Sequence, residues 1–458
     1  MNPQILTELV AGEVIVPESQ DYDQLRNVFN QAGNPAMIVR AQNNDDIVTA
    51  IRFAREQDLA LSVRSGGHGL SGQATNNGGL VLDLTAFNKV ELLDAESSLV
   101  RIGAGAHWGE VAKALAEYGL AISSGDTNQV GVGGLTLGGG IGWMVRTHGL
   151  TIDSLQAAEL ITADGRTLRV SAGEHPNLFW AIRGGGGNFG VVTSFDFRVQ
   201  PHTTVVGGSV IYDMAEVETV LAAWTSSMRE APEELNSTIV LFPGFGPQAV
   251  PQVMVLLCYA GDDEVAANKA IAPFLQLGTV KVQNIQKKPC YAMLENAALP
   301  PGLQMIAQDG FLKTLSKEAL GVIAANYGKV GSPIIQIRSL GGAMARVSPQ
   351  ATAFAHRENE ALVIMAAFAP SAAPEEQVRH IRQAAWRPLE LLATGAYANY
   401  LSDAGEASVA AAYPSATYAR LASIKAIYDP DNVFNQNQNI KPAANTQAGK
   451  TDPQDAHD

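Results

Sequence analysis

The sequence predicts an α+β protein that is built from two lobes. Its 458 residues exceed the size at which a single hydrophobic core stops growing, so we expect at least two cores. Strand and helix patterns alternate through residues 1–200. Between residues 203 and 395, strands separated by helices favour an antiparallel sheet with helices on one face.

The first lobe begins with strands around a capped helix. The predicted strands are residues 37–40, 59–65 and 80–84. Residues 43–57 have Asn and Asp at the start and apolar residues at helical spacing, which predicts a capped helix. Residues 107–119 place apolar side chains on one helical face, and Gly119 stands where a C-cap belongs.

A hairpin, a short helix and a long strand complete this lobe. Residues 155–173 predict a hairpin that turns at Asp164 and Gly165. Residues 175–184 predict the short helix, and a long strand ends near residue 199.

The second lobe repeats strands and helices without an internal repeat. Its predicted strands are residues 206–213, 253–260, 333–340 and 362–369, and its predicted helices include residues 214–228 and 375–393. After residue 397 the chain reads YANYLSD, then a helix, then YDPDNVFNQNQNI. The last residues lack large apolar side chains and are predicted to be disordered.

Composition excludes several kinds of partner. The hydrophobic content of 46% and charged content of 17% are those of a folded globular protein. The net charge of -14 repels phosphate backbones and anionic lipid, so we expect no nucleic acid and no membrane surface as partner. The N-terminus does not resemble a signal peptide, and no apolar run approaches the ~18 residues that span a bilayer.

The two cysteines, Cys258 and Cys290, indicate the compartment. They match neither a metal spacing nor a disulfide framework, although one bridge between them stays open. A reducing cytosol is the simpler interpretation, so a cytoplasmic protein without a metal site is expected.

Glycine is in excess, with 44 residues, and three segments carry the excess: residues 64–72, 125–142 and 184–190. Glycine lets a backbone approach a ligand closely, and consecutive exposed N–H groups bind anions. Three such segments in one lobe indicate a large phosphate-bearing ligand held mainly by the backbone. The alternative is that each segment is only a turn.

The last glycine segment contains one G-x-G-x-x-G match, at Gly185, Gly187 and Gly190. A Rossmann dinucleotide site needs a strand, then the glycines, then a helix. Here a predicted helix precedes the glycines and a strand follows them. We therefore exclude a Rossmann NAD site.

His68 lies between glycines in RSGGHGLSG, where its immediate neighbours have no side chains to pack on it. An ordinary surface or hydrogen-bonded histidine is the competing interpretation. The sequence contains no G-x-S-x-G, no G-x-x-x-x-G-K-[ST] and no H-E-x-x-H, which removes three common enzyme classes.

Taken together, the motifs resemble a known family. RSGGHGLSG, GVGGLTLGGGIGW, DGRTLRVS and LFWAIRGGGGNFGVVTSFDF, with the closing YANYLSD and YDPDNVFNQNQNI, are similar to the berberine-bridge-enzyme-like branch of the vanillyl-alcohol-oxidase flavoprotein superfamily. The resemblance covers residues 36–200 and 395–442. Small bacterial members of the 6-hydroxy-D-nicotine oxidase kind are similar in length and layout.

The resemblance implies a domain organisation and a cofactor. We expect a PCMH-type FAD-binding domain in residues 1–203, a substrate domain in 204–395, a returning segment in 396–442 and a disordered tail in 443–458. The resemblance also implies FAD bonded covalently through His68.

Each part of the cofactor has implied contacts. Ser65, Gly66, Gly67 and Gly69 are expected to wrap the pyrophosphate, with Arg64 beside them. The residues expected along the isoalloxazine and ribityl side are Gly131, Val132, Gly133, Gly134, Gly138, Gly139, Gly140 and Gly142. Those expected at the adenine end are Gly187, Asn188, Gly190 and Val191, and Asn437 and Asn439 lie in the closing segment that touches the flavin.

One departure from the family concerns a second flavin link. Many relatives form it with a cysteine in G-x-C-P-x-V-G-V-G-G, where this chain has Thr127. A threonine hydroxyl is not the thiolate nucleophile that this link needs. A single tether is therefore expected.

The resemblance also suggests the catalytic residues. Tyr400 and Tyr397 are the candidate bases, and Tyr400 matches the tyrosine that several relatives use near flavin N5. A phenol with a pKa near 10 needs help to act as a base, and packing is the alternative role for both tyrosines. Gln336 and Arg338 share one face of a predicted strand, which points either toward the substrate or into solvent.

The implied reaction is the oxidation of a small alcohol, sugar or amine, with hydride transfer to the flavin and reduction of O₂ to H₂O₂. Val130 lies where relatives favour a small residue that leaves room for O₂, which favours an oxidase. The alternatives are a dehydrogenase with another acceptor and a non-catalytic flavin- or ligand-binding protein. No feature indicates the oligomeric state.

Overall fold

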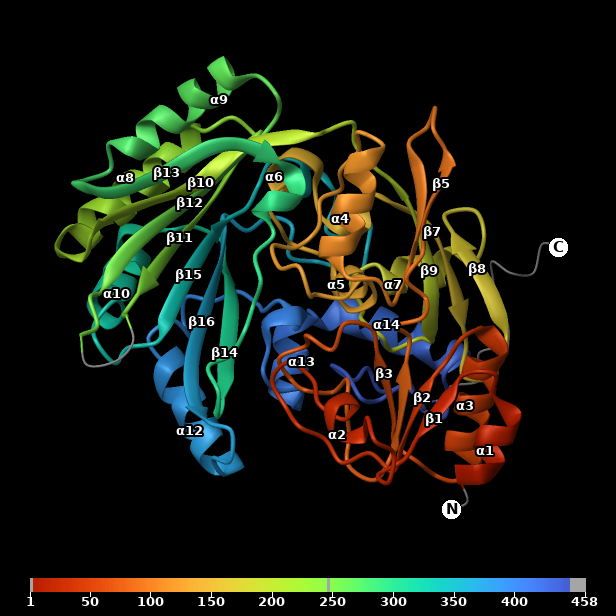
Figure 1. Cartoon of the computed structure of the whole chain (residues 1–458). Helices are drawn as coiled ribbons and strands as arrows, with labels where there is room; N and C mark the ends of the chain where they lie inside the picture. Colours follow the sequence, from red (N-terminus) through yellow and green to blue (C-terminus); the bar gives the residue numbers. More distant parts are fainter. Residues whose placement is uncertain (1–2, 245–247, 445–458) are drawn as a thin grey trace.

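The computed structural model describes residues 3–244 and 248–444 (Figure 1). The predicted disordered tail, residues 443–458, lies almost wholly outside these ranges. Two lobes stand side by side: two smaller sheets with their helices form the first, and one large sheet covered by helices forms the second (Figure 1). The predicted α+β class is therefore confirmed.

The first lobe contains a four-stranded and a five-stranded sheet. The four-stranded sheet has the order β1 (Glu13–Ile15), β2 (Met37–Arg40), β4 (Leu80–Asp83) and β3 (Leu61–Arg64), and β2 and β3 both run parallel to β4. The five-stranded sheet, β5 (Val90–Asp94), β6 (Leu99–Gly103), β9 (Val191–Arg198), β7 (Leu155–Ile161) and β8 (Thr167–Ser171), is antiparallel. The first glycine segment leaves β3 at its carboxyl end, where parallel strands usually present ligand sites.

Local signals specify two first-lobe helices as predicted, α3 and α4. In α3 (Asn44–Glu56), the side chain of Asn43 caps the N-terminus by accepting a hydrogen bond from the N–H of Asp46 at 3.0 Å. α4 (Trp108–Glu117) ends before Gly119, whose φ of +70° is the left-handed conformation of a C-cap glycine.

The second glycine segment contains a helix that the sequence did not predict, α5 (Val132–Gly138). Glycine has a low helix propensity, so local sequence argues against a helix here. Tertiary contacts hold it instead: the N–H of Gly133 donates to the carbonyl of Ala104 at 3.0 Å. Two other elements match their predictions, the hairpin of β7 and β8 and the short helix α7 (Pro176–Ile182).

The second lobe is a seven-stranded antiparallel sheet. Its order is β13 (Val280–Pro289), β10 (Thr204–Asp213), β12 (Gln252–Ala260), β11 (Leu235–Phe242), β15 (Ile334–Ser339), β16 (Ala361–Pro370) and β14 (Leu303–Leu312). The four predicted strands are confirmed, and β11, β13 and β14 were missed. β13 is a polar edge strand that is mostly exposed, so it lacks the apolar pattern that identifies a strand.

Helices cover one face of this sheet, as predicted (Figure 1). They are α8 (Val217–Glu230), α9 (Glu264–Ile271), α10 (Lys317–Asn326) and α12 (Glu375–Trp386), the last shorter than predicted. Trp224 of α8 and Val255 of β12 are fully buried in the core between helices and sheet. Successive residues of a strand point to opposite faces, so Leu256 turns away from that core and toward the first lobe.

The C-terminal segment packs on the first lobe. It contains α13 (Glu406–Ala412) and α14 (Ser415–Tyr428), and Leu421, Phe434 and Ile440 lie in the same core as β2. The division into domains at residues 203 and 395 stays a prediction.

Candidate flavin and substrate site

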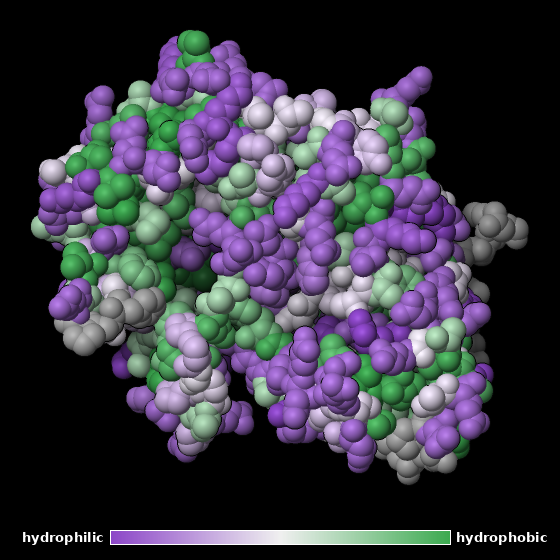
Figure 2. Space-filling view, viewed as in Figure 1, coloured by the Kyte–Doolittle hydropathy of each residue, from purple (hydrophilic) through white to green (hydrophobic). Residues whose placement is uncertain are grey.

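A cavity of about 640 Å³ lies between the lobes. Residues of all three glycine segments line it, together with the uncovered face of the seven-stranded sheet and the C-terminal segment. Figure 2 shows a recess beside that sheet, where hydrophobic and hydrophilic residues meet. The three segments are thus parts of one site.

The first glycine loop presents free donors to this cavity. None of the backbone N–H groups of Gly66, Gly67, His68 and Gly69 donates a hydrogen bond to another described residue. A Cβ on Gly66 would lie 2.4 Å from the backbone nitrogen of Gly131, so the first two glycine segments touch backbone to backbone. Consecutive free N–H groups of this kind suit the oxygens of a phosphate.

Each glycine segment also leaves open space in front of one glycine. A Cβ on Gly69, Gly134 or Gly187 would meet no atom within 4 Å, and all three residues line the cavity. Side chains there would fill the space that a ligand needs.

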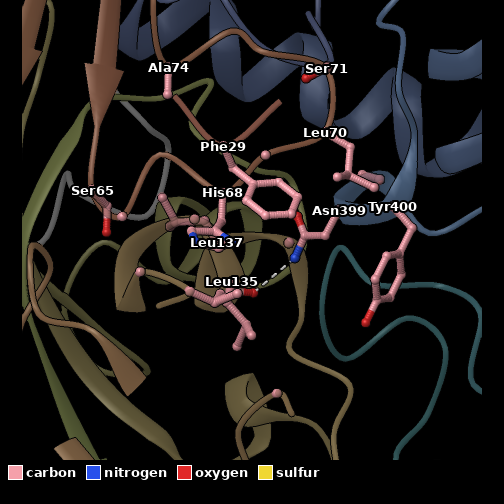
Figure 3. Close-up of a pocket in the computed structure, with 18 of the residues that line it drawn as sticks. Phe29, Ser65, His68, Leu70, Ser71, Ala74, Leu135, Leu137, Asn399 and Tyr400 are labelled. Carbon is pink, nitrogen blue, oxygen red and sulfur yellow. Dashed lines mark hydrogen bonds between the residues drawn. The ribbon is translucent and has the colours of Figure 1, made fainter. Parts of the chain in front are cut away.

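His68 lies in the cavity wall, stacked on Phe29 with a ring-centroid distance of 4.5 Å (Figure 3). Burial, helped by the nearby His107, lowers the pKa of His68 to about 4. The imidazole is therefore neutral at neutral pH. Neither of its ring nitrogens hydrogen-bonds to a described residue, so a nitrogen lone pair is available.

Hydrogen bonds join the third glycine segment to the closing segment. The Asn188 side chain donates to the carbonyl of Gln438 at 3.1 Å and accepts from the N–H of Ile440 at 2.9 Å. The Asn437 side chain donates to the carbonyl of Gly187 at 3.1 Å, while its buried oxygen has no partner in the described chain. That oxygen is free to accept from a ligand.

Most predicted cofactor residues line the cavity, and six do not. Those on the lining are Ser65, Gly66, Gly67, His68, Gly69, Gly131, Gly133, Gly134, Gly138, Gly187, Asn188, Gly190, Val191 and Asn437. Those away from it are Arg64, Val132, Gly139, Gly140, Gly142 and Asn439.

Four of the six have structural roles within the chain. Arg64 is buried, and its guanidinium is 2.7 Å from the carboxylate of Asp83. The N–H of Val132 donates to the carbonyl of Ala106 at 2.9 Å, and Gly139 has a φ of +129° that few other residues adopt. The carbonyl of Gly142 accepts from Asn236 at 3.1 Å.

Tyr397 and Tyr400 both line the cavity, with ring centroids 5.6 Å apart. The Tyr397 hydroxyl accepts from the N–H of Gly140 and from the Asn399 side chain, each at 2.9 Å. Burial raises its pKa to about 12. The Tyr400 hydroxyl, by contrast, has no hydrogen-bond partner among the described residues, although burial raises its pKa too.

Gln336 and Arg338 of β15 face the cavity and not solvent. Arg338 pairs with Asp126, donates to the Gln336 side chain at 3.2 Å and lies over the Tyr400 ring at 5.2 Å from its centroid. A carboxylate, a guanidinium and a phenol therefore lie together in the cavity wall.

Four neighbours of the site were not predicted. Asn399 connects Tyr397 to the carbonyl of Leu135 at 3.2 Å (Figure 3). Its place in YANY could have indicated a role. Asp126 was read only as part of the glycine segment. Nothing in the sequence connects Phe29 with His68, or Asp309 with the tyrosines, because those contacts depend on tertiary structure.

The second-link position carries Thr127, which lines the cavity and donates its hydroxyl proton to the Asp126 carboxylate at 3.0 Å. Neither cysteine lines this cavity, and both are free thiols. Burial raises the pKa of Cys290 to about 11 and that of Cys258 further.

No described helix combines the length and hydrophobicity that a bilayer-spanning segment needs. No group of three or more His, Cys, Asp or Glu side chains in residues 3–244 and 248–444 is arranged to hold a metal ion.

The donor set fits FAD. The free N–H groups of the first glycine loop suit a pyrophosphate, and the unpartnered Asn437 oxygen suits a hydrogen-bond donor. The space before Gly134 is open. His68 supplies a neutral nucleophile at the same wall.

Comparison with known proteins agrees with this assignment. The family profile described as "FAD binding domain" matches residues 35–171, and "Berberine and berberine like" matches residues 396–441. The chain is 32% identical to the uncharacterized FAD-linked oxidoreductase YgaK of Bacillus subtilis (strain 168), over 94% of this chain and 97% of that protein. It is 29% identical to (R)-6-hydroxynicotine oxidase of Paenarthrobacter nicotinovorans, over 96% of this chain and 99% of that protein.

A solved structure extends the likeness to the fold. Xylooligosaccharide oxidase from Myceliophthora thermophila C1 superposes with a TM-score of 0.85 at 25% identity, covering 96% of this chain and 99% of that one. Sequence and fold agree over nearly the whole length, and the predicted resemblance is confirmed. The chain therefore belongs to the berberine-bridge-enzyme-like family of FAD-linked oxidoreductases.

Proposed function

We propose that this FAD-linked oxidoreductase is an oxidase that holds FAD covalently on His68 and oxidises a small ring-bearing alcohol or amine, with O₂ as second substrate. One observation carries the proposal. The free hydroxyl of Tyr400 lies in the same cavity as His68 and the three glycine segments. A cofactor site and a candidate base thus share one space.

The chain's own residues define how the cofactor would be held. The N–H groups of residues 66–69 would bind the pyrophosphate, and the side-chain oxygen of Asn437 would accept one further hydrogen bond. The neutral imidazole of His68 provides the lone pair for a bond to the flavin 8α-methyl carbon. When bound, FAD supplies a two-electron acceptor for a hydride and a route for those electrons to O₂, giving H₂O₂.

Tyr400 would take the proton from the substrate O–H or N–H. Its hydroxyl is unengaged by the described chain, whereas the Tyr397 hydroxyl already accepts two hydrogen bonds. The Arg338 guanidinium beside the Tyr400 ring lowers the pKa of the phenol, which burial raises. The free hydroxyl, rather than a difference in pKa, is what favours Tyr400 over Tyr397 as general base in this proposal.

The sheet face supports a ring-shaped, mostly apolar substrate. Leu256, Ile334, Ile364 and Ala366 line the cavity from β12, β15 and β16 of the seven-stranded sheet. Gln336, Arg338 and Thr238 are the polar side chains among them. An oligosaccharide would leave several hydroxyls unpaired on this hydrocarbon surface, at ~1–3 kcal/mol each. A ring with one hydroxyl or amine directed at Tyr400 loses much less binding free energy, because it leaves fewer polar groups unpaired.

Val130 supports O₂ as second substrate, and the two cysteines support a cytoplasmic location. Val130 lines the cavity with a small side chain, which favours access for O₂. The two free thiols suit a reducing compartment, so we place the protein in the cytoplasm.

Anaerobic rapid mixing tests the proposal. Wild-type protein is mixed with a panel of aryl and alicyclic alcohols and amines and with oligosaccharides, and flavin bleaching is followed. Tyr400→Phe should slow bleaching by about 10²–10⁴-fold, the usual effect of removing a general base, with flavin content unchanged. Admitting O₂ should then restore the colour and release H₂O₂. Bleaching by Tyr400→Phe at the wild-type rate, or reoxidation only by another acceptor, contradicts the proposal.

A further inference from the structure

An ion pair joins the second glycine segment to the sheet at the edge of the cavity. The carboxylate of Asp126 contacts the guanidinium of Arg338, whose side chain is only 10% exposed. Arg338 also donates to Gln336, while its buried Nε has no partner in the described chain. Asp126 is therefore the only carboxylate that the described residues pair with this cation.

The backbone around Asp126 is held firmly. Its carbonyl accepts from the N–H of Glu295 at 2.9 Å, and the N–H of Asn128 donates to the carbonyl of Glu295 at 2.8 Å. The hydroxyl of Thr127 donates to the Asp126 carboxylate. The residue that replaces the family's second flavin-linking cysteine thus orients this carboxylate.

Arg338 carries the effect of Asp126 to Tyr400. Its guanidinium carbon lies 5.2 Å from the centroid of the Tyr400 ring, within range of a cation–π contact. The cation stabilises the phenolate form of Tyr400, and the Asp126 carboxylate opposes it. The two members of the pair act on Tyr400 in opposite directions.

Two more ionisable groups act on Tyr400. Tyr397 lies in the same turn, and Asp309 comes from β14; both disfavour the phenolate. Burial raises the pKa of Asp309 well above its usual value. Within the described chain, Arg338 is the one cation that acts on Tyr400.

We propose that Asp126 is a positioning residue that sets the pH at which Tyr400 loses its proton, because it holds Arg338 against the ring and offsets part of the guanidinium charge. The inference rests on the proposed role of Tyr400 as general base. Thr127 supports it by orienting the carboxylate. If Asp126 only stabilised the cavity wall, replacing it would not change the pH at which Tyr400 loses its proton.

Three substitutions test this. Asp126→Asn keeps the shape and an acceptor oxygen but removes the charge, so Tyr400 should ionise at a pH lower by at least about one unit. Arg338→Met removes the cation and should move the ionisation of Tyr400 to higher pH. Asp126→Glu keeps the charge and should stay near the wild type.

Two measurements on the holoprotein report the ionisation of Tyr400. Nuclear magnetic resonance of ring-labelled tyrosine, with Tyr400→Phe to assign the signal, follows the ionisation directly. The pH dependence of anaerobic flavin reduction follows its consequence. The matched control is Glu295→Gln, which removes another carboxylate from the cavity wall and should leave the Tyr400 titration in place.

The outcomes separate the two proposals. Opposite shifts for Asp126→Asn and Arg338→Met support the inference. A Tyr400 titration that moves in neither variant, or equally in Glu295→Gln, overturns it. If the titration shifts as expected but Tyr400→Phe still reduces its flavin at the wild-type rate, the base assignment fails and the positioning role of Asp126 remains.

Discussion

The hydroxyl groups of Tyr397 and Tyr400 differ in what they contact, although the residues lie in one short turn. Tyr397 accepts from Gly140 and Asn399, and so fastens the second glycine segment to the C-terminal segment. The sequence predicted packing as the alternative role for both tyrosines. For Tyr397 the observed role is to accept a hydrogen bond from the backbone of the second glycine segment.

Tyr397→Phe should therefore lower the stability of the protein more than it lowers the rate of flavin reduction. The substitution leaves the buried N–H of Gly140 without its acceptor, which typically costs ~1–3 kcal/mol of unfolding free energy. Denaturant unfolding of the variant should show this loss, while flavin reduction falls far less than in Tyr400→Phe. Unchanged stability together with a collapse in the reduction rate would assign the chemistry to Tyr397.

His68 gives a second prediction for a single residue. A histidine whose pKa is about 4 stays neutral well below the pH at which an ordinary histidine becomes protonated. Covalent incorporation of FAD should hence proceed as fast at pH 5.5 as at pH 7.5, and slow only as the pH falls toward about 4. Acid-precipitated protein should retain its colour, and His68→Ala should release free FAD.

Peptide mass mapping checks the site and the number of links. One flavinylated peptide, containing His68, is expected, because Thr127 is no thiolate and both cysteines lie off the cavity. A second adduct on Cys258 or Cys290 would refute the single tether.

Among the elements, local signals were sufficient for some and not for others. α3 carries its own cap in Asn43, and the hairpin of β7 and β8 carries its own turn, so both could be predicted. The glycine-rich α5 could not, since its backbone bonds to residues remote in sequence replace propensity. β13 could not, because an exposed edge strand needs no apolar face.

The same contrast applies to the site. The glycine segments indicate a phosphate-bearing ligand by their composition, and the role of His68 was predicted from the family resemblance. The contacts of Asp126 with Arg338 and of Phe29 with His68 join residues from different elements, and no sequence spacing encodes them.

Two helical glycines allow a matched prediction. Neither Gly134 in α5 nor Gly321 in α10 has an atom within 4 Å of an added Cβ, but only Gly134 faces the cavity. Alanine should stabilise either helix by ~0.5–1 kcal/mol. Gly321→Ala should raise the unfolding free energy and keep full flavin loading. Gly134→Ala should fold as well yet bind FAD more weakly.

Flavin absorbance per polypeptide measures the FAD loading of both variants, and thermal unfolding measures their stability. Full loading of Gly134→Ala would contradict the placement of the flavin against α5. A loss of flavin in Gly321→Ala would show that loading responds to helix stability in general.

At the scale of the whole molecule, the cavity belongs to no single lobe. Its walls come from the glycine segments, from the seven-stranded sheet and from the C-terminal segment that packs on the first core. A ligand in this cavity contacts all of these parts of the chain at once. Binding of FAD should therefore stabilise the assembled molecule and not one lobe.

His68→Ala makes that linkage measurable, because its FAD exchanges with solution. A ligand that binds only the folded state stabilises it by RT ln(1 + [L]/Kd), about 2.7 kcal/mol at a concentration of 100 Kd. The unfolding midpoint of His68→Ala should thus rise with added FAD, whereas the wild type, with its flavin tethered, should show no dependence. ADP, which lacks the isoalloxazine ring, serves as the control and should raise the midpoint less. If the midpoint of His68→Ala ignores added FAD, the cavity between the lobes is not where the cofactor binds.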